Sequence, residues 1–267
     1  MVNTEPMKTF TAAELDELAD AYFDTFDKLA LLPGARIERA AHGTCLMVSG
    51  MLTPITNAVC CPRRTAVLDE VAALAETMSG IGVPWSIQTR GEPEQGVLDL
   101  AARHGLTERI EIPLMAVDQP DFVTRPPRDT KAVVHAAGVD RREDYLQVFT
   151  QGFGIPLEVL GPMALPEIFD MPRYTCYVVE AAGQPVACGV AGFSREHVGI
   201  GNVTTLAEHR GRGYGRLVTE AAVTSGFADG AQTAYLVASA DGLPLYESMG
   251  FRTVENWNYL IAGAPQE

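Results

Sequence analysis

The chain has 267 residues, of which 47% are hydrophobic and 20% are charged, and its formal net charge is −14 at pH 7. This composition is typical of a soluble globular protein, and the length suits two small domains better than one large core. The negative charge argues against nucleic acid and anionic membranes as partners, and no apolar run reaches the roughly 18 residues that a membrane helix needs. The N-terminal segment lacks the basic and apolar stretches of a signal peptide, so we expect a cytoplasmic protein.

The five cysteines show no metal-binding or disulfide pattern. Two of them are adjacent, no C-x-x-C pair occurs, and the histidines do not cluster near them. We therefore expect buried free thiols and no metal site. The residues concerned are Cys45, Cys60, Cys61, Cys176 and Cys188.

Hydrophobic periodicity divides the chain into two series of helices and strands, which predicts a mixed α/β sheet. The first series opens with an amphipathic helix over residues 11–30, which Thr11 caps and Glu14 completes as a capping box. Gly105 ends a later short helix of this series. The other elements expected here are strands at 35–49, 54–61, 85–89 and 110–117 and helices at 68–78 and 96–104.

Residues 118–129 contain three prolines and little periodicity, which is typical of a linker. We therefore divide the chain into residues 1–125 and residues 126–267. The second series has expected strands at 131–136, 174–180, 185–193, 197–206, 233–239 and 253–261, and helices at 141–152, 215–228 and 243–249.

A glycine-rich loop, Arg210-Gly-Arg-Gly-Tyr-Gly-Arg216, lies between a predicted strand and a predicted helix. We expect its three glycines to adopt positive φ and to bring backbone N–H groups close to an anion, beside three arginines and a helix N-terminus. A pyrophosphate fits this arrangement, although a plain surface loop with the same residues is the alternative. A P-loop is excluded because Gly215 is followed by Arg216 and Leu217, and a dinucleotide fold is excluded because the loop comes late in the chain.

Two motifs in this half resemble the GNAT superfamily of N-acetyltransferases. Arg210-x-x-Gly213-x-Gly215 is similar to the family's cofactor signature, and Tyr246-x-x-x-Gly250-Phe251 is similar to the pattern that ends the helix after its fifth strand. The resemblance covers residues from about 130 to 262. It implies a GNAT fold in the C-terminal half, acetyl-CoA as co-substrate, and transfer of an acetyl or acyl group to a primary amine.

The resemblance also implies where the cofactor binds. In the family the fourth and fifth strands splay apart, the pantetheine arm pairs with the fourth strand, and the loop N–H groups hold the pyrophosphate. Ser239 stands where many members have an asparagine that touches the cofactor. The implied cofactor-binding residues are Val203, Thr204, Thr205, Arg210, Gly211, Arg212, Gly213, Tyr214, Gly215, Arg216 and Ser239.

By the same resemblance, Tyr246 is the catalytic residue and donates a proton to the leaving thiolate, while a strand N–H stabilises the oxyanion. The alternative is a core aromatic whose hydroxyl only positions the sulfur. The family's glutamate at the start of the fifth strand is replaced by Ala234. Glu180, Glu208 and His209 are candidates for the general base, as is ordered water, and the choice stays open.

The N-terminal half resembles a degenerate copy of the same fold. Its Gly105 and Leu106 match Gly250 and Phe251, but Ala101 stands at the position of the tyrosine. The segment CCPRRTAV before the helix at 68–78 contains no glycine. We expect a GNAT-like, non-catalytic domain that forms one wall of the acceptor site, with an unrelated α/β extension as the alternative.

These features predict an acyl-CoA-dependent N-acyltransferase that acts on a small-molecule or peptide amine. The alternative is a catalytically silent CoA-binding sensor or scaffold, which the missing base and the tandem arrangement favour. The identity of the acceptor and the formation of a homodimer are left open.

Overall fold

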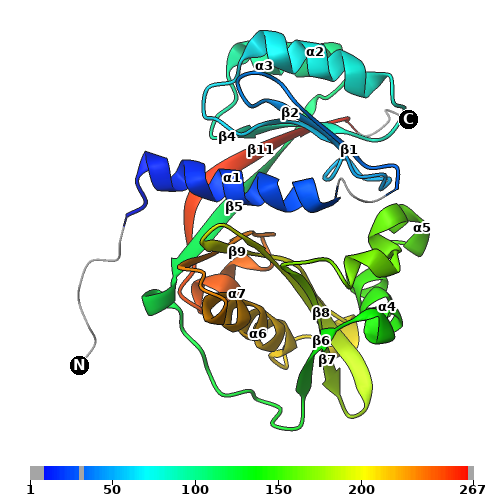
Figure 1. Cartoon of the computed structure of the whole chain (residues 1–267), viewed down its shortest axis with the longest axis vertical. Coiled ribbons are helices and arrows are strands. Elements are labelled where there is room, and N and C mark those ends of the chain that lie inside the picture. Colours follow the sequence, from blue (N-terminus) through cyan, green and yellow to red (C-terminus); the bar gives the residue numbers. More distant parts are fainter. Residues whose placement is uncertain (1–8, 30–32, 264–267) are drawn as a thin grey trace.

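The computed structural model describes residues 9–29 and 33–263, and their strands form one mixed sheet of 11 strands (Figure 1). The order across the sheet is β1-β2-β3-β4-β11-β5-β10-β9-β8-β7-β6. The α/β prediction is therefore confirmed. The strands are β1 (Arg36–Arg39), β2 (Cys45–Val48), β3 (Ala58–Cys61), β4 (Ser86–Arg90), β5 (Glu108–Asp118), β6 (Val133–Ala137), β7 (Tyr174–Ala181), β8 (Gln184–Ser194), β9 (His197–Thr205), β10 (Thr233–Val237) and β11 (Arg252–Ile261).

The predicted helices are present with small shifts at their ends. The capping box forms, because the Glu14 N–H donates to Thr11 Oγ1 over 3.3 Å and the Thr11 N–H donates to Glu14 Oε2 over 2.8 Å. Ala30, which the prediction included in the first helix, lies outside the described residues. The helices are α1 (Ala12–Leu29), α2 (Leu68–Ser79), α3 (Gln95–Arg103), α4 (Arg142–Phe153), α5 (Leu157–Leu160), α6 (Tyr214–Ala228) and α7 (Leu243–Glu247).

Two predicted strands were wrong in extent. The strand expected at 54–61 covers only Ala58–Cys61 as β3, because residues 54–57 lie in the turn before it. Residues 35–49 form the hairpin β1–β2 rather than a single strand, because a turn at residues 40–44 reverses the chain. The Ala40 N–H donates to the Thr44 carbonyl over 2.8 Å, and Gly43 in this turn has a φ of 98°.

Helices cover both faces of the sheet, and the period-two alternation of strand side chains explains why. In β7, Cys176 and Val178 pack with α4, whereas Tyr177 and Val179 pack with α6. In the N-terminal half, alternate residues of β2 and β3 pack with α1 on one face and with α2 and α3 on the other. All five cysteines are buried and free, which confirms the prediction of buried thiols.

The two halves repeat one topology. The series β2-β3-α2-β4-α3-β5 corresponds element by element to β8-β9-α6-β10-α7-β11. In each series an antiparallel pair is followed by a helix and a parallel strand. The turns after α3 and α7 also match, because Leu106 N–H bonds the Ala101 carbonyl over 2.9 Å and Phe251 N–H bonds the Tyr246 carbonyl over 3.1 Å. Gly105 and Gly250 have φ values of 75° and 94°.

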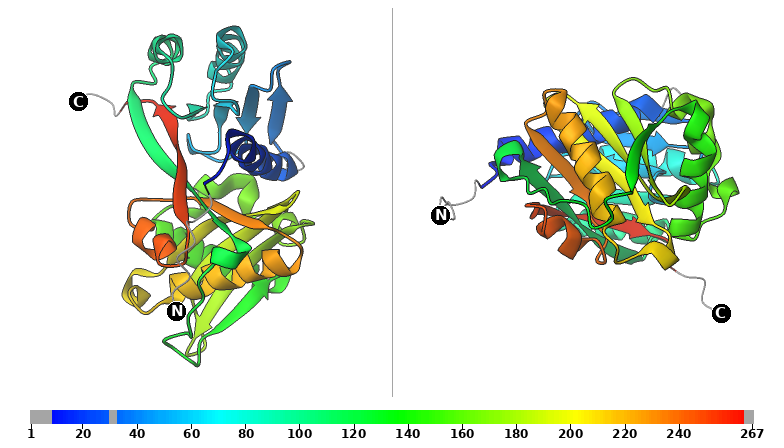
Figure 2. Two further views of the ribbon diagram at one scale, coloured as in Figure 1. Left: turned by 90° about the vertical axis from the view of Figure 1, so that its left-hand side faces the viewer. Right: turned by 90° about the horizontal axis from the view of Figure 1, so that it is seen from below.

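The last strand of each half lies against the other half. β5 pairs with β10, β11 pairs with β4, and β5 and β11 pair with each other at the centre of the sheet. Both strands run from one lobe to the other in the views of Figures 1 and 2. The division at residue 125 stays a prediction, and the halves on either side of it share these central strands.

Candidate functional site

The site is built where β9 and β10 stop pairing. The two strands run parallel over only three residue pairs, the last of which is Tyr235 with Gly199. Beyond that point β9 continues to Thr205 and still pairs with β8, while β10 continues to Val237 and pairs with β5. One edge of β9 therefore leaves its main-chain groups facing a gap inside the sheet.

Local packing fits this divergence. A Cβ atom on Gly199 would lie 2.7 Å from the ring of Tyr235, so only glycine leaves room for this aromatic side chain. The register of β8 and β9 shifts between Cys188 and Val190, which marks a β-bulge. Asn202 sits in this bulge with a φ of 55°, a left-handed conformation that asparagine tolerates better than most residues.

The glycine-rich loop follows β9 and delivers the chain to the N-terminus of α6. Gly211 and Gly213 have φ values of 74° and 93°, as predicted. The expectation was wrong for Gly215, which lies in the first turn of α6 and has no positive φ. A Cβ atom there would meet Thr205 Oγ1 at 3.5 Å, an ordinary contact. The N-terminal N–H groups of α6 and its positive dipole end lie at this loop.

A cleft of about 710 Å³ opens between this loop, α7, the linker and the free edge of β9. It brings together all but one of the predicted cofactor-binding residues. Arg212 does not line it and instead donates from Nη2 to the Glu208 carbonyl over 3.1 Å. The predicted residues that line the cleft are Val203, Thr204, Thr205, Arg210, Gly211, Gly213, Tyr214, Gly215, Arg216, Ser239 and Tyr246.

Two predicted arginines of the cleft also hold its walls in place. Arg210 donates to the carbonyls of Thr205 and Gly152, each over 3.1 Å, and so ties the loop to β9 and to α4. Arg216 donates to Glu220 over 3.2 Å and to the hydroxyl of Ser248 after α7. These contacts fix the positions of the guanidinium groups, so an anion in the cleft meets charges that are already oriented.

The linker supplies two further arginines that the sequence analysis missed. Arg125 and Arg128 line the cleft beside the loop. The Arg125 N–H donates to Glu220 Oε1 over 3.0 Å, and Arg128 Nη1 donates to the Gly211 carbonyl over 3.2 Å. The run Arg-Pro-Pro-Arg in the linker was the available signal, because prolines flanked by arginines can hold charge on an extended segment.

Tyr246 lies in α7 and lines the same cleft with only 8% of its surface exposed. Burial raises the pKa of its phenol to about 12, so the hydroxyl is protonated at neutral pH. Its ring packs edge-on against Phe251 at 5.9 Å between centroids. A Cβ atom on Gly242 would come within 2.8 Å of the ring, so glycine at that position gives the tyrosine its space.

None of the three candidate bases lines the cleft or the second cavity described below. Glu180 pairs with Arg141 over 3.1 Å and lies 3.5 Å from His135. Glu208 and His209 lie in the turn between β9 and the glycine-rich loop. Ala234 is fully buried in β10.

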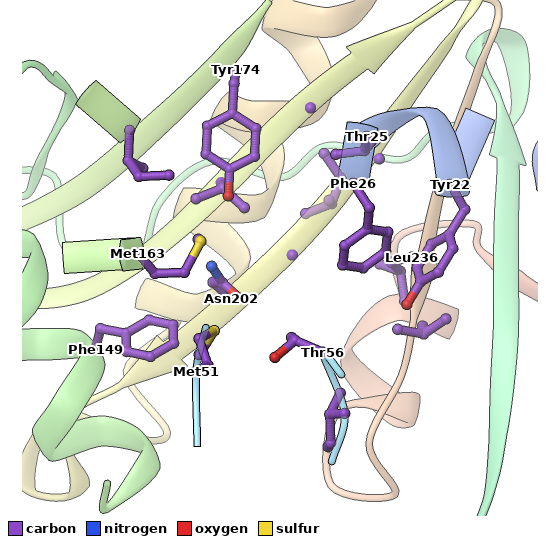
Figure 3. A pocket seen from close by; sticks show the side chains of 18 of the residues that line it. Tyr22, Thr25, Phe26, Met51, Thr56, Phe149, Met163, Tyr174, Asn202 and Leu236 are labelled. Carbon is purple, nitrogen blue, oxygen red and sulfur yellow. The ribbon is translucent and has the colours of Figure 1, made fainter. Parts of the chain in front are cut away.

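A second cavity of about 250 Å³ lies on the other side of the gap (Figure 3). It is lined by α1, the loop between β2 and β3, α4, residues 160–168, and β7 to β10. Gly201 and Asn202 line this cavity, and the next residues of β9, Val203 and Thr204, line the cleft. Consecutive residues of β9 therefore line the two spaces.

The equivalent place in the N-terminal half is closed. All four residues of β3, from Ala58 to Cys61, pair with β4 from Ser86 to Thr89, so no edge is left free. The residue before α2 is Val67, with a φ of −87°, and no glycine lies in the segment between β3 and α2.

Comparison with known proteins agrees with this geometry. Residues 172–253 match the model of the Acetyltransferase (GNAT) domain. The C-terminal half contains a GNAT acetyltransferase domain. The match spans both the divergent strands of the GNAT domain and its glycine-rich loop, and it supports acyl transfer as the chemistry of the protein. No curated protein matches the chain.

Solved structures extend the likeness to the whole fold. A GCN5-related N-acetyltransferase from Kribbella flavida has 18% identity and a TM-score of 0.68, and the match covers 94% of this chain and 96% of that one. A functionally unknown conserved protein from Staphylococcus epidermidis ATCC 12228 has 13% identity and a TM-score of 0.62, with 88% and 96% covered. At these identities the likeness concerns the fold alone.

Two further findings apply to residues 9–29 and 33–263. No helix among them has the length and apolar character needed to cross a membrane. In the same part of the chain, no group of three or more His, Cys, Asp or Glu residues is arranged to hold a metal ion.

Proposed function

We propose that the protein is an acyl-CoA-dependent N-acyltransferase that moves an acetyl group from acetyl-CoA to an amine. The observation that carries this proposal is the divergence of β9 and β10. It leaves a free strand edge whose consecutive residues line the second cavity and the arginine-lined cleft, and in this proposal a long, thin co-substrate lies along that edge.

The cleft suits the anionic part of CoA. Arg125, Arg128, Arg210 and Arg216 line it in a chain whose net charge is −14. The N–H groups of residues 211–216 and the N-terminus of α6 add partial positive charge at the same place. In this proposal the pyrophosphate binds there, the pantetheine arm pairs with the edge of β9 at Val203 to Thr205, and Ser239 contributes a hydroxyl.

In this proposal, acyl transfer takes place at the gap between β9 and β10. The amine nitrogen attacks the thioester carbonyl, and a main-chain N–H on the free edge of β9 stabilises the developing oxyanion. Tyr246 donates its phenolic proton to the leaving thiolate and regains one from solvent. A pKa of about 12 supports this role, because the proton is present at neutral pH.

The second cavity is the acceptor site in this proposal. Tyr22, Thr25 and Phe26 of α1 and Met51 of the loop after β2 form its far wall. These residues belong to the N-terminal half, which agrees with the expectation that this half walls one side of the acceptor site. The closed pair β3–β4 supports a half that does not itself bind CoA.

One observation favours the silent CoA-binding alternative. Among the residues that the structure describes, no carboxylate or imidazole lines the second cavity, so no protein base is in place there. An enzyme with this site must lose the amine proton to water, or act on an amine that is already neutral.

The test combines binding and turnover on the full-length chain. Purified protein is mixed with acetyl-CoA and a panel of neutral and cationic amines, thiol release is followed, and the N-acetyl product is identified by mass spectrometry. Product formation supports the enzyme. CoA binding without turnover on any amine would favour the silent alternative, and the absence of CoA binding would overturn both.

A further inference from the structure

The second cavity, which we call the acceptor cavity, is large enough for a substituted ring. Its volume is about 250 Å³, whereas an engineered cavity of about 150 Å³ in another protein holds one benzene molecule. Side chains from α1, α4, β7 and the loop between β2 and β3 enclose it (Figure 3). Its apolar lining includes Phe26, Met51, Phe149, Met163 and Leu236.

The acceptor cavity has no formal charge. No Asp, Glu, Lys, Arg or His residue lines it within residues 9–29 and 33–263. Its polar groups are hydroxyls and one side-chain amide. Burial raises the pKa values of Tyr22, Tyr145, Tyr174 and Tyr235, so these phenols stay neutral in the folded protein.

Asn202 is a polar residue of the cavity wall where it adjoins the cleft. It stands in the β9 bulge, next to the residues that line the cleft, and its Nδ2 donates to the hydroxyl of Tyr145 over 3.3 Å. This hydrogen bond fixes the orientation of the Asn202 amide, and Oδ1 is then available to accept a hydrogen bond. In Figure 3 the amide lies between Met163 and Met51, and the hydroxyls of Tyr174 and Thr56 point toward the same space.

An uncharged lining of this kind favours the binding of neutral amines over cationic ones. An alkylamine is an ammonium ion at neutral pH, so it would have to leave water without a counter-charge and lose a proton without a nearby base. An aromatic amine is uncharged at neutral pH, has a flat apolar body, and can donate an N–H to Asn202 Oδ1. A neutral aromatic amine therefore avoids the desolvation of an unpaired charge and needs no deprotonation before it attacks the thioester.

We propose that the acceptor cavity binds an uncharged aromatic amine, with Asn202 as the residue that positions its nitrogen at the gap between β9 and β10. This inference rests on the proposed function, because it names the acceptor class of the same site. In the transfer, the N–C bond forms and the C–S bond of the thioester breaks. The thiolate takes a proton from Tyr246, and the acylated nitrogen loses one to water.

The test uses two isomers with identical atoms, 4-ethylaniline and phenethylamine, of which only the second is cationic at neutral pH. Calorimetric titration of each into the full-length chain, with and without CoA, measures binding independently of turnover. We expect 4-ethylaniline to bind about 100-fold more tightly, as follows from burying an unpaired charge. Equal or tighter binding of phenethylamine, or no binding of either isomer, overturns the inference.

The matched variant is Asn202→Asp, which keeps the shape and the tolerance of positive φ but adds a negative charge. The variant should bind phenethylamine more tightly and so reduce or reverse the preference for 4-ethylaniline, because the new carboxylate pairs with the ammonium ion while it still accepts an N–H from the aromatic amine. CoA affinity should be unchanged, which serves as the check of folding. A variant that keeps CoA affinity but leaves both isomers unaffected contradicts the positioning role.

Two outcomes separate this inference from the proposed function. Binding of 4-ethylaniline without binding of CoA would overturn the proposed function but would still support the inference that the cavity prefers neutral amines. Turnover of phenethylamine but not of 4-ethylaniline would keep the function and overturn the inference. Exclusion of 4-ethylaniline by octanoyl-CoA but not by acetyl-CoA would assign the cavity to an acyl chain, which also overturns it.

Discussion

The substitution Tyr246→Phe removes one oxygen atom from the cleft and leaves the ring in place. The ring contacts with Phe251 and Gly242 do not involve the hydroxyl. Only about 8% of the side chain is exposed, and burial is the sole cause of its raised pKa. We therefore expect the free energy of unfolding and the affinity for CoA to change by less than about 1 kcal/mol.

The loss in rate should be large and independent of pH. A phenol with a pKa of about 12 is protonated throughout the usual assay range, so it can donate at every pH that is tested. Removing a positioned proton donor costs about 10²–10⁴ in turnover. The ratio of wild-type to variant kcat should stay constant up to about pH 10, because the donor only begins to ionise above that.

The assay is thiol release from acetyl-CoA at saturating acceptor, with CoA affinity measured calorimetrically on the same preparations. Tyr177→Phe is the matched control, since Tyr177 is also buried but lines neither cavity. A Tyr246→Phe enzyme that keeps its rate would show that the phenol is a packing residue. A rate that falls only in proportion to CoA affinity would show that it positions the sulfur rather than protonating it.

The remaining predictions concern stability. Gly250→Ala should lower the free energy of unfolding by about 3 kcal/mol in urea titrations, because its φ is 94° and the added carbon would lie 2.3 Å from the Asp121 carbonyl oxygen. Gly105→Ala, at the equivalent turn with nothing within 4 Å, should cost only about 1 kcal/mol, and equal losses would refute the steric argument. Burial raises the pKa values of Tyr246 and Tyr259 from 10.0 to about 12, so the stabilisation they give is complete below pH 10 and is lost as the pH rises from 10 to 12. Each phenol accounts for about 3 kcal/mol of that loss, and a free energy of unfolding that stays flat across this interval would contradict it.

Local patterns in the sequence predicted most elements, because each depends on neighbours within a few residues. The capping box of Thr11 and Glu14, the turn at Gly105, and the positive φ of Gly211 and Gly213 are all set by local backbone chemistry. The hairpin at residues 36–48 was missed because no Asn-Gly or Asp-Gly pair marks its turn.

The exchange of β5 and β11 between the halves could not be predicted in this way. Both strands fit either half by their pattern, and their place is decided by pairing between residues far apart in the chain. The ion pair of Arg90 in β4 with Glu255 in β11, at 2.7 Å, is one contact that only this exchange creates. The sequence motifs located the cleft, but not its linker wall with Arg125 and Arg128.

The acceptor cavity also escaped the sequence analysis. Its lining comes from α1, α4, residues 160–168, four strands and the loop between β2 and β3, and these segments are brought together only by the tertiary fold. Tyr22 and Phe26 lie in the amphipathic helix that was predicted over residues 11–30, but a helical pattern does not indicate the space that their side chains enclose. Cavities of this kind follow from tertiary packing.

The most direct test of the account is a calorimetric titration of CoA into the full-length protein. The account predicts one site per chain, because the edge of β9 is free whereas β3 is fully paired with β4. Gly213→Val should weaken binding at least about tenfold through backbone strain beside the anion site, since its φ is 93°. Gly183→Val, with a φ of 78° in the distant turn between β7 and β8, is the matched control and should leave binding unchanged. Two sites per chain, no site, or equal losses in both variants would contradict the account.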